Sequence, residues 1–519
     1  MPLNELLPKA TRLYPNNEAI VCKDQKLTYE QFAKRVWRLS NGLSDLGLQK
    51  GDRLAILHEN CHVFLEAYFA SAHLGLVLVP LNIRLAFNEL VAIVNDSGAG
   101  TLLAQAKFRD KVESCAFKEG QIQRIIWTQQ DVGVHGRMMG IDYETFLAGQ
   151  PETPPPEISL DDTDVAHLYY TSGTSGRPKG VMLTHKNVKT HALGTIAELN
   201  LTDKDHWVHG APLFHLADAW ATFAITWVGG KHILIPTFDP LAVFEAIEEE
   251  KVTITNLVPT MFTTMLNHPE VGNFDYSSLR VLLSGGAPIA PELVRRIINT
   301  FECDYIQTYG MTETSPYLTM SILKNHLKAL TLEEQLRVKA TTGREFINVE
   351  LKVVDDKGKE VPRDNRQVGE IIVRGDTVTP GYWNLPEETR EAIRDGWLYT
   401  GDLAVIDVQG YVTIVDRKKD MIVTGGENVY STETENILYM HPDILEAAVI
   451  GVPDPHWGEA VKACVVLKKG RKTTEQEIIS FSKQHLAHYK APKSVDFLTA
   501  LPRTGSGKIY KKALREKKV

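Results

Sequence analysis

The order of apolar and polar positions in the first part of the chain predicts alternating helices and strands. Apolar residues recur at helical spacing over 28–46, and a short apolar run follows at 53–58. A second helical pattern at 64–74 leads into the apolar run 77–80, and each helical pattern ends at a glycine. Strands that alternate with helices in this way form a mostly parallel sheet covered by helices. We therefore predict an α/β fold.

The same alternation continues beyond residue 180 and changes near residue 349. The later segments that we expect are helices at 187–198 and 241–250, strands at 232–236, 254–258 and 279–284, and β-rich stretches at 349–354, 370–373 and 411–415. The last hundred or so residues again mix helix and strand. We expect a large N-terminal domain of doubly wound, mostly parallel sheets with a small β-barrel-like subdomain, followed by a small α+β C-terminal domain.

Composition narrows the class of protein. A chain of 519 residues is too long for one small core, and its net charge of −8 argues against nucleic acid as a partner. The five cysteines are scattered without a Cys-x-x-Cys pair, which is typical of a reducing compartment, so we expect a cytoplasmic protein. We expect no signal peptide, and the longest apolar candidate, 217–230, is too short and too polar to span a membrane.

A glycine- and hydroxyl-rich stretch at 169–181 contains the most specific chemistry. It follows the apolar run 165–170 and ends in Lys179. Glycines allow backbone N–H groups to approach an anion, hydroxyl groups add donors, and a lysine brings a cation to phosphate oxygens. The spacing is not that of Walker A, because Gly180 stands where the metal-binding hydroxyl would be. A surface linker is the alternative, but a linker rarely follows a strand directly, so we predict a nucleotide-binding loop.

Further motifs follow this loop in a fixed order. They are Tyr309-Gly310-Met311-Thr312-Glu313-Thr314, the segment 396–402 ending in Asp402, the segment 416–422, Gly425-Gly426-Glu427-Asn428-Val429, and the segment 502–508 ending in Lys508. With these motifs the whole chain resembles the adenylate-forming superfamily of acyl- and aryl-CoA synthetases, adenylation domains and firefly luciferase. The pattern is closest to AMP-forming fatty-acyl-CoA synthetases. The resemblance implies an N-terminal domain, 1–418, with the ATP and acyl sites, and a mobile C-terminal domain, 419–519.

The resemblance also implies where ATP and Mg²⁺ bind. The residues assigned to the phosphates are Thr171, Ser172, Gly173, Thr174, Ser175, Gly176 and Lys179, and those assigned to the adenine side are Gly285, Gly286, Ala287, Tyr309, Gly310 and Thr312. Thr174 and Glu313 are assigned to Mg²⁺, which suits a hard cation that takes one or two protein oxygens beside phosphate oxygens. A surface ion pair is the alternative for Glu313. Asp402 and Arg417 are assigned to the ribose hydroxyl groups.

Three further roles follow from the same resemblance. Lys508 matches the catalytic lysine that stabilises the charge growing on the α-phosphate when the substrate carboxylate attacks. Lys419 matches the hinge about which the C-terminal domain rotates between two half-reactions, although the family often has Asp there. After the rotation, Gly425, Gly426 and Glu427 would face the site in place of Lys508.

The residues expected at the acid pocket are mainly apolar. His215 stands where amino-acid-activating domains carry an aspartate, which disfavours an α-amino acid. The residues that we expect to line the pocket are His215, Trp220, Val258, Gly310 and Thr314. A place in the core of a helix is the alternative for Trp220, and the pattern does not give the direction of Asp218.

Coenzyme A is the expected thiol, because no carrier-protein segment follows Lys508, and Lys490 is a candidate contact for its phosphates. We predict an AMP-forming ligase that makes acyl-CoA from a fatty acid of medium or longer chain. The alternatives are an aryl or other short acid, luciferase-like oxidation, acyl loading of a carrier protein, or a catalytically silent adenylate-binding protein. A homodimer is compatible with the sequence.

Overall fold

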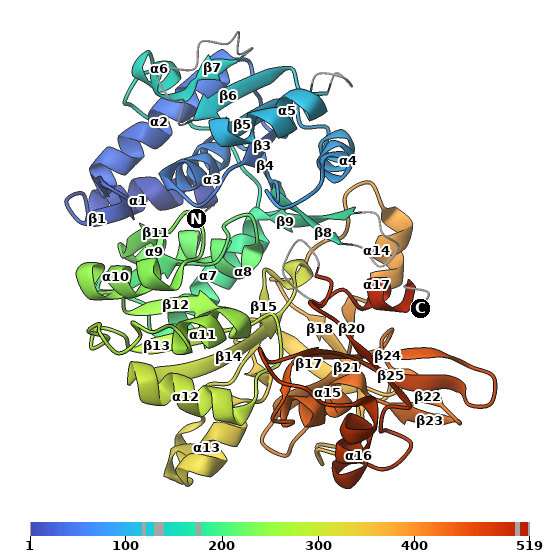
Figure 1. Cartoon of the computed structure of the whole chain (residues 1–519). Helices are drawn as coiled ribbons and strands as arrows, with labels where there is room; N and C mark the ends of the chain where they lie inside the picture. The colour runs from blue at the N-terminus through green and yellow to red at the C-terminus, as the bar shows by residue number, and fades with distance from the viewer. Residues whose placement is uncertain (1, 117–120, 129–139, 173–177, 504–508, 517–519) are drawn as a thin grey trace. The chain divides into compact units, whose positions relative to one another are not determined.

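The chain folds into two compact units (Figure 1). The computed structural model describes residues 2–116, 121–128, 140–172, 178–503 and 509–516. The first unit comprises Met1–Glu350 and Arg374–Leu398, and the second comprises Leu351–Val373 and Tyr399–Val519. This division differs from the boundary between 418 and 419 that the family resemblance implies, and that boundary stays a prediction.

A 7-stranded sheet forms one part of the first unit. Its strands, in spatial order, are β7 (Ile141–Asp142), β6 (Arg124–Thr128), β5 (Thr101–Gln105), β3 (Arg53–Leu57), β4 (Val77–Pro80), β8 (Val165–Ser172) and β9 (Pro178–Thr184). Neighbouring strands are parallel except β8 and β9, which form an antiparallel pair at one edge. Helices α4 (Phe87–Ser97) and α5 (Arg109–Ala116) cover one face, and α3 (His62–Leu74) contacts the sheet with α2 (Tyr29–Asp45) beside it (Figure 1).

A second sheet of the first unit has a parallel centre and antiparallel ends. Its strands, in spatial order, are β2 (Gln25–Thr28), β1 (Glu18–Cys22), β11 (Lys231–Leu234), β10 (His206–His209), β12 (Ile254–Leu257), β13 (Val281–Ser284), β14 (Asp304–Gly310), β15 (Tyr317–Met320) and β16 (Gly343–Glu345). Helices α10 (Pro240–Glu250), α11 (Pro259–Leu266) and α12 (Pro291–Phe301) share one buried apolar cluster with these strands. The carboxyl ends of the parallel strands therefore meet at one edge, where ligands bind in such folds.

Local sequence signals explain where many of these elements begin and end. Thr28 and Gln31 form a capping box at the start of α2, and α10, α11 and α12 each begin with proline, which fits the first turn of a helix. The remaining elements of this unit are η1 (Leu3–Glu5), α1 (Leu6–Leu13), η2 (Ala106–Phe108), α6 (Tyr143–Ala148), α7 (His185–Leu199), α8 (Leu216–Ala219), α9 (Ala221–Val228), η3 (Thr312–Thr314), η4 (Asn325–Ala329), α13 (Leu332–Lys339), α14 (Pro386–Ala392) and β19 (Ile393–Arg394).

The second unit is β-rich, as the sequence predicts from residue 349 onward. It holds most of four neighbouring strands, β17 (Glu350–Val354), β18 (Gly369–Arg374), β20 (Trp397–Ile406) and β21 (Tyr411–Arg417). A 5-stranded sheet follows, with β22 (Ile422–Thr424), β23 (Glu427–Val429), β24 (Ile444–Asp454), β25 (Gly458–Leu467) and β26 (Ser494–Phe497). Helices α15 (Ser431–Tyr439), α16 (Glu475–His485) and α17 (Lys511–Glu516) complete the unit. It packs its own apolar cluster around Val449, Val461 and Ile478.

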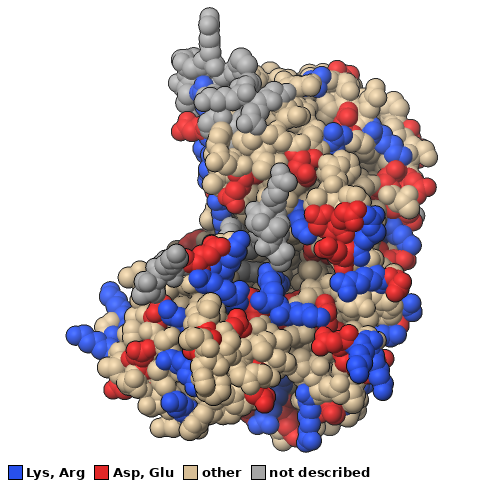
Figure 2. All heavy atoms as spheres, turned by 90° about the vertical axis from the view of Figure 1, so that its right-hand side faces the viewer, with Lys and Arg blue, Asp and Glu red and all other residues tan. Residues whose placement is uncertain are grey.

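The predicted helices and strands agree with the structure to within a few residues. The helix expected at 28–46 is Tyr29–Asp45, and the strand expected at 254–258 is Ile254–Leu257. The apolar pattern predicted no element before residue 27, yet β1 lies inside a sheet, where Ile20 pairs with His232. No helix in the described part of the chain is both long and apolar enough to cross a membrane. Basic and acidic side chains are interspersed on the face drawn in Figure 2.

Candidate active site

The β8–β9 hairpin flanks the predicted phosphate loop. Thr171 pairs with Lys179 and Ser172 with Pro178 across the two strands, so both sides of the loop are fixed in register. The ammonium group of Lys179 lies 5.0 Å from the centre of the Tyr382 ring, a cation–π distance. The structure thus fixes the strand that carries Lys179. Several predicted residues lie outside the described residues, namely Gly173, Thr174, Ser175, Gly176 and Lys508.

Glu313 is buried beside the same tyrosine. Glu313 is only 7% exposed, which disfavours a surface ion pair. Its Oε1 atom accepts a hydrogen bond from the Tyr382 hydroxyl group at 3.0 Å. Burial, together with the charge of Glu313, raises the pKa of Tyr382, so this hydroxyl group stays protonated and donates. The backbone oxygen of Glu313 also accepts from the N–H of Thr379 at 2.8 Å.

The Glu313 carboxylate fits a magnesium ion that arrives with ATP. Mg²⁺ favours oxygen ligands and is usually held by one or two carboxylates plus substrate phosphates, rather than by an all-protein cage. Glu313 supplies one carboxylate, and within the described ranges there is no group of three or more His, Cys, Asp or Glu side chains suited to a metal ion. Glu313, with Thr174 as predicted, would hold the ion. The bound ion would neutralise negative charge on the phosphate oxygens.

The residues predicted for the adenine side lie on neighbouring strands. Gly285 follows β13, and a Cβ atom added there would lie 2.5 Å from the Thr308 hydroxyl oxygen, one residue before Tyr309 on β14. Gly286 has φ +81°, which suits glycine, and the Ala287 carbonyl accepts a hydrogen bond from the Gln307 side chain at 2.8 Å. This brings Gly285, Gly286, Ala287 and Tyr309 together in one region of the first unit.

Gly310 and its neighbours form a tight turn at the end of β14. A Cβ atom on Gly310 would lie 1.8 Å from the carbonyl oxygen of Pro316, so no other residue fits without a backbone shift. Thr312 and Thr314 belong to the short helix η3, and the Thr314 hydroxyl group donates to this same Pro316 oxygen at 2.5 Å. Glu313 is therefore presented from a backbone of fixed shape.

The predicted ribose pair lies in the second unit. Asp402 and Arg417 are direct partners across β20 and β21, and Arg417 Nε lies 3.0 Å from Asp402 Oδ1. The carboxylate is nearly fully buried, whereas about half of the Arg417 side chain is exposed. The two residues are already paired in the fold, in agreement with a shared role.

The hinge and CoA-side candidates also lie in the second unit. Lys419 is exposed in the turn after β21. Gly425 and Gly426, with φ +60° and +82°, join β22 to β23, and positive φ at both positions is typical of a type I′ hairpin turn that presents Glu427. Lys490 is held by both oxygens of Glu433 at 2.8 Å, so contact with a CoA phosphate would compete with this pair.

Trp220, one of the residues expected at the acid pocket, lies in an aromatic cluster of the first unit. Trp220 is only 2% exposed and lies 5.0 Å from Trp207, 5.2 Å from Tyr317 and 5.4 Å from His191, measured between ring centres. The cluster is thus continuous around this indole. We define the acid-side cluster as Trp207, Trp220, His191, Tyr317 and Phe346.

Of the other predicted residues, Gly310 adjoins this cluster, and His215 and Val258 lie at the starts of helices. Tyr317 pairs with Gly310 across β14 and β15, and His215 caps the N-terminus of α8 just before Trp220. Val258 directly precedes α11 and lies 3.6 Å from where a Gly286 Cβ atom would be. Trp220 is buried as the core alternative requires, and its role in an acid pocket stays a prediction.

A buried polar network behind Trp220 was not anticipated from the sequence. The Asp218 carboxylate accepts from Trp207 Nε1 at 3.1 Å and lies 2.7 Å from His209 Nδ1. His209 Nε2 lies 3.0 Å from His232 Nδ1, and the other nitrogen of His232 lies 2.9 Å from the Thr226 hydroxyl group. Asp218 therefore points into the core, where the polar groups satisfy one another.

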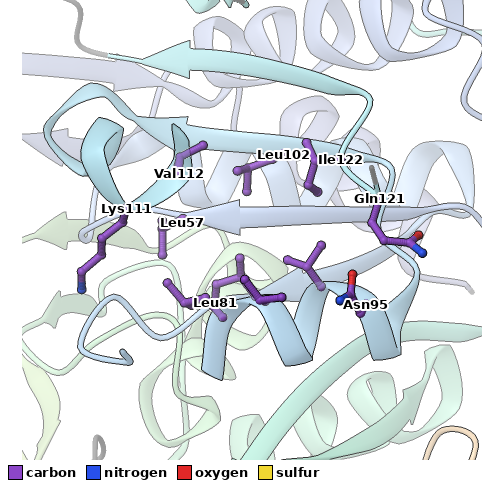
Figure 3. A pocket seen from close by; sticks show the side chains of 11 residues that line it. Leu57, Leu81, Asn95, Leu102, Lys111, Val112, Gln121 and Ile122 are labelled. Atoms are coloured by element: carbon purple, nitrogen blue, oxygen red, sulfur yellow. The ribbon is translucent and has the colours of Figure 1, made fainter. Parts of the chain in front are cut away.

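A small apolar cavity of about 30 Å³ lies elsewhere in the first unit (Figure 3). It is lined by Leu57, Leu81, Leu90, Val91, Val94, Asn95, Leu102, Lys111, Val112, Gln121 and Ile122. This volume corresponds to about one or two water molecules. None of the predicted site residues that the structure describes lines it.

The chain is similar to known proteins over almost its whole length. A family described as AMP-binding enzyme matches residues 7–383, and the AMP-binding enzyme C-terminal domain matches residues 433–508. A feruloyl-CoA synthase from an Amycolatopsis species is 39% identical over 510 residues, which cover 98% of this chain and 97% of that protein. A long-chain-fatty-acid–CoA ligase from Thermus thermophilus is 35% identical over 522 residues, with 99% and 94% covered.

A solved structure extends the comparison to the fold. The crystal structure of ATP-bound MatB from Rhodopseudomonas palustris superposes with a TM-score of 0.88 at 32% identity, and 99% of each chain is covered. The family match and the near-complete coverage of these relatives bear out the resemblance seen in the motifs. The chain belongs to the AMP-binding enzyme family, the adenylate-forming acyl- and aryl-CoA ligases, which use ATP, Mg²⁺ and coenzyme A.

Proposed function

We propose that this protein is an AMP-forming CoA ligase for a compact aromatic carboxylic acid. The observation that carries the proposal is the packing of Trp220 among Trp207, His191 and Tyr317. Because these rings pack beside the strand pair that carries Gly310, they favour a short acid with a flat ring over an extended chain. The similarity to a feruloyl-CoA synthase supports the same class of acid.

The reaction has two balanced steps. A carboxylate oxygen of the acid attacks the α-phosphorus of ATP and pyrophosphate leaves; the CoA sulfur then attacks the acyl carbon and AMP leaves. We assign Lys179 to the β- and γ-phosphates and Glu313 with Thr174 to the metal ion. Lys508 would stabilise the charge that builds up in the first step. Asp402 and Arg417 would orient the ribose.

A fatty acid of medium or longer chain is the second candidate. The apolar residues around His215 suit it, and one relative is a long-chain-fatty-acid–CoA ligase. The distinction depends on how far an alkyl chain penetrates past Trp220.

The test is pyrophosphate release by the purified protein with ATP and Mg²⁺, with and without CoA, across benzoic, hydroxycinnamic and straight-chain acids from C4 to C16. The proposal expects the largest kcat/KM for an aromatic acid and strong stimulation by CoA. A maximum at C8 to C16 would overturn the aromatic assignment in favour of the second candidate. No release with any acid, with CoA present, would contradict both.

A further inference from the structure

The segment 379–383 runs along β9, the strand that carries Lys179, and is hydrogen-bonded to it. Trp383 N–H donates to the Gly180 carbonyl oxygen at 2.7 Å, and Met182 N–H donates to the Gly381 oxygen at 3.1 Å. Val181 and Tyr382 form a β-bridge between these two contacts. The Thr379 hydroxyl group also donates to the Met182 oxygen at 2.5 Å. The backbone of Tyr382 is therefore held in register with β9.

From this position the Tyr382 side chain touches two groups on different elements. Its hydroxyl group donates to Glu313 Oε1 on η3 at 3.0 Å, while Lys179 Nζ on β9 lies 5.0 Å from its ring centre. Within the described residues, the Lys179 ammonium group makes no ion pair. One half-buried ring thus contacts the groups assigned to the metal ion and to the phosphates.

The physical consequence is that each charge is oriented separately. A carboxylate and an ammonium group attract each other, and a direct pair would occupy the oxygen and the N–H donors that ATP and its metal ion need. A ring face holds the ammonium group by its quadrupole, and a phenol hydroxyl group fixes one carboxylate oxygen by a charge-assisted hydrogen bond.

We propose that Tyr382 is a positioning residue for Mg–ATP, which holds Glu313 and Lys179 apart and oriented. The inference rests on the proposed roles of those two residues. Loss of the hydroxyl group and loss of the ring should have different effects. The hydroxyl group contacts Glu313, which is assigned to the metal ion, and the ring contacts Lys179, which is assigned to the phosphates.

The experiment measures nucleotide binding by calorimetry, without the acid, for ATP with Mg²⁺ and for ATP with EDTA. Tyr382→Phe removes the hydroxyl group and keeps the ring; we expect it to weaken Mg–ATP binding about tenfold and to leave metal-free ATP binding within about twofold. Tyr382→Leu also removes the ring and should weaken both forms by a further two- to fivefold.

Two further variants serve as references for the binding constants of the Tyr382 variants. Tyr276→Phe also removes one tyrosine hydroxyl group, which donates to the Val271 oxygen at 2.7 Å, and it should change neither binding constant. Glu313→Gln should abolish the gain in ATP affinity that Mg²⁺ gives. In the double variant, Tyr382→Phe should weaken Mg–ATP binding little beyond the effect of Glu313→Gln alone. Urea unfolding of each variant shows whether stability has changed.

Either of two results overturns the role of Tyr382. One is that Tyr382→Phe binds Mg–ATP as tightly as the wild type while Glu313→Gln does not. The other is that Tyr382→Phe weakens ATP equally with and without Mg²⁺, as a purely structural residue would. If Glu313→Gln itself keeps the full effect of Mg²⁺, the assignment of Glu313 to the metal ion fails, and the role of Tyr382 fails with it.

Discussion

The ATP side and the acid side of the first unit are built in opposite ways. On the ATP side, Lys179 and Glu313 belong to short motifs, and turns shaped by glycine, such as that at Gly310, present them. On the acid side, Trp220 lies against aromatic rings from α7 and β15, and a network from Asp218 to Thr226 fills the space behind it. The contrast is between predicted ATP-site residues presented by local backbone shape and predicted acid-site residues placed by packing between distant segments.

The largest effect that we expect concerns stability on the acid side. Asp218→Ala leaves Trp207 Nε1 and His209 Nδ1 without their buried acceptor, which should lower the free energy of unfolding by about 3–5 kcal/mol. Urea denaturation measures it. Asp162→Ala, which removes an exposed partner of Lys189, is the control and should cost about 1 kcal/mol or less. Equal losses in the two variants would show that the buried network does not stabilise the fold.

The next effect concerns the rate of adenylation on the ATP side. Lys508→Ala should slow adenylation by about 10²–10³-fold, because it removes a cation from the developing phosphate charge. Thioester formation from preformed acyl adenylate should continue. Lys512→Ala, in an exposed pair with Glu516 in the same tail, serves as the control. If both half-reactions fall together, the two-state assignment of Lys508 is wrong.

Acid pH should destabilise the fold through a buried histidine of the acid-side cluster. Burial lowers the pKa of His191 to about 3, and its Nε2 accepts the Tyr317 N–H, so the folded state keeps this ring neutral. The unfolded chain takes up a proton below about pH 6.5, so stability from this residue falls as pH drops, by about 2 kcal/mol from 6.5 to 5.

The variant His191→Gln tests this dependence. It should reduce the slope of unfolding free energy against pH between 6 and 5 by up to one proton, or about 1.4 kcal/mol per pH unit. Other buried histidines, such as His167 and His232, would retain their share of the slope. An unchanged slope in His191→Gln would mean that this ring is protonated in the folded protein.

The smallest effect concerns the choice of acid. Trp220→Phe opens space within the acid-side cluster, so kcat/KM for bulkier or longer acids should rise about tenfold relative to compact aromatic acids. The KM for ATP should stay unchanged. The measurement is the acid panel repeated with this variant. A shift in the KM for ATP without any change in acid preference would place Trp220 outside the acid pocket.

The two sides also differ in how well the sequence predicts them. The pairing of Asp402 with Arg417 and the nearness of Gly285 to Tyr309 agree with the motif-based assignments, because glycines and charged residues act through the backbone close to them. Periodicity likewise predicted most helices and strands.

Other features depend on contacts that no local pattern encodes. Tyr382 and the direction of Asp218 escaped prediction: Tyr382 meets Glu313 from 69 positions away, and Asp218 sits in an otherwise apolar stretch. The adjacent aromatic residues Tyr382 and Trp383 are the sequence signal that could have indicated this position. Strand β1, paired with β11 more than two hundred positions later, escaped for the same reason.

The attachment of 379–383 to β9 has a consequence for how the protein is made. β9 is the last strand of its sheet, and its outer edge is covered by a segment 197 positions later, as the contact of Met182 with Thr379 shows. On the ribosome this edge is therefore open while those residues are synthesised, and an open strand edge is a site for unwanted pairing. The strand that carries Lys179 emerges about midway through the unit, and its edge is covered only near the unit's end.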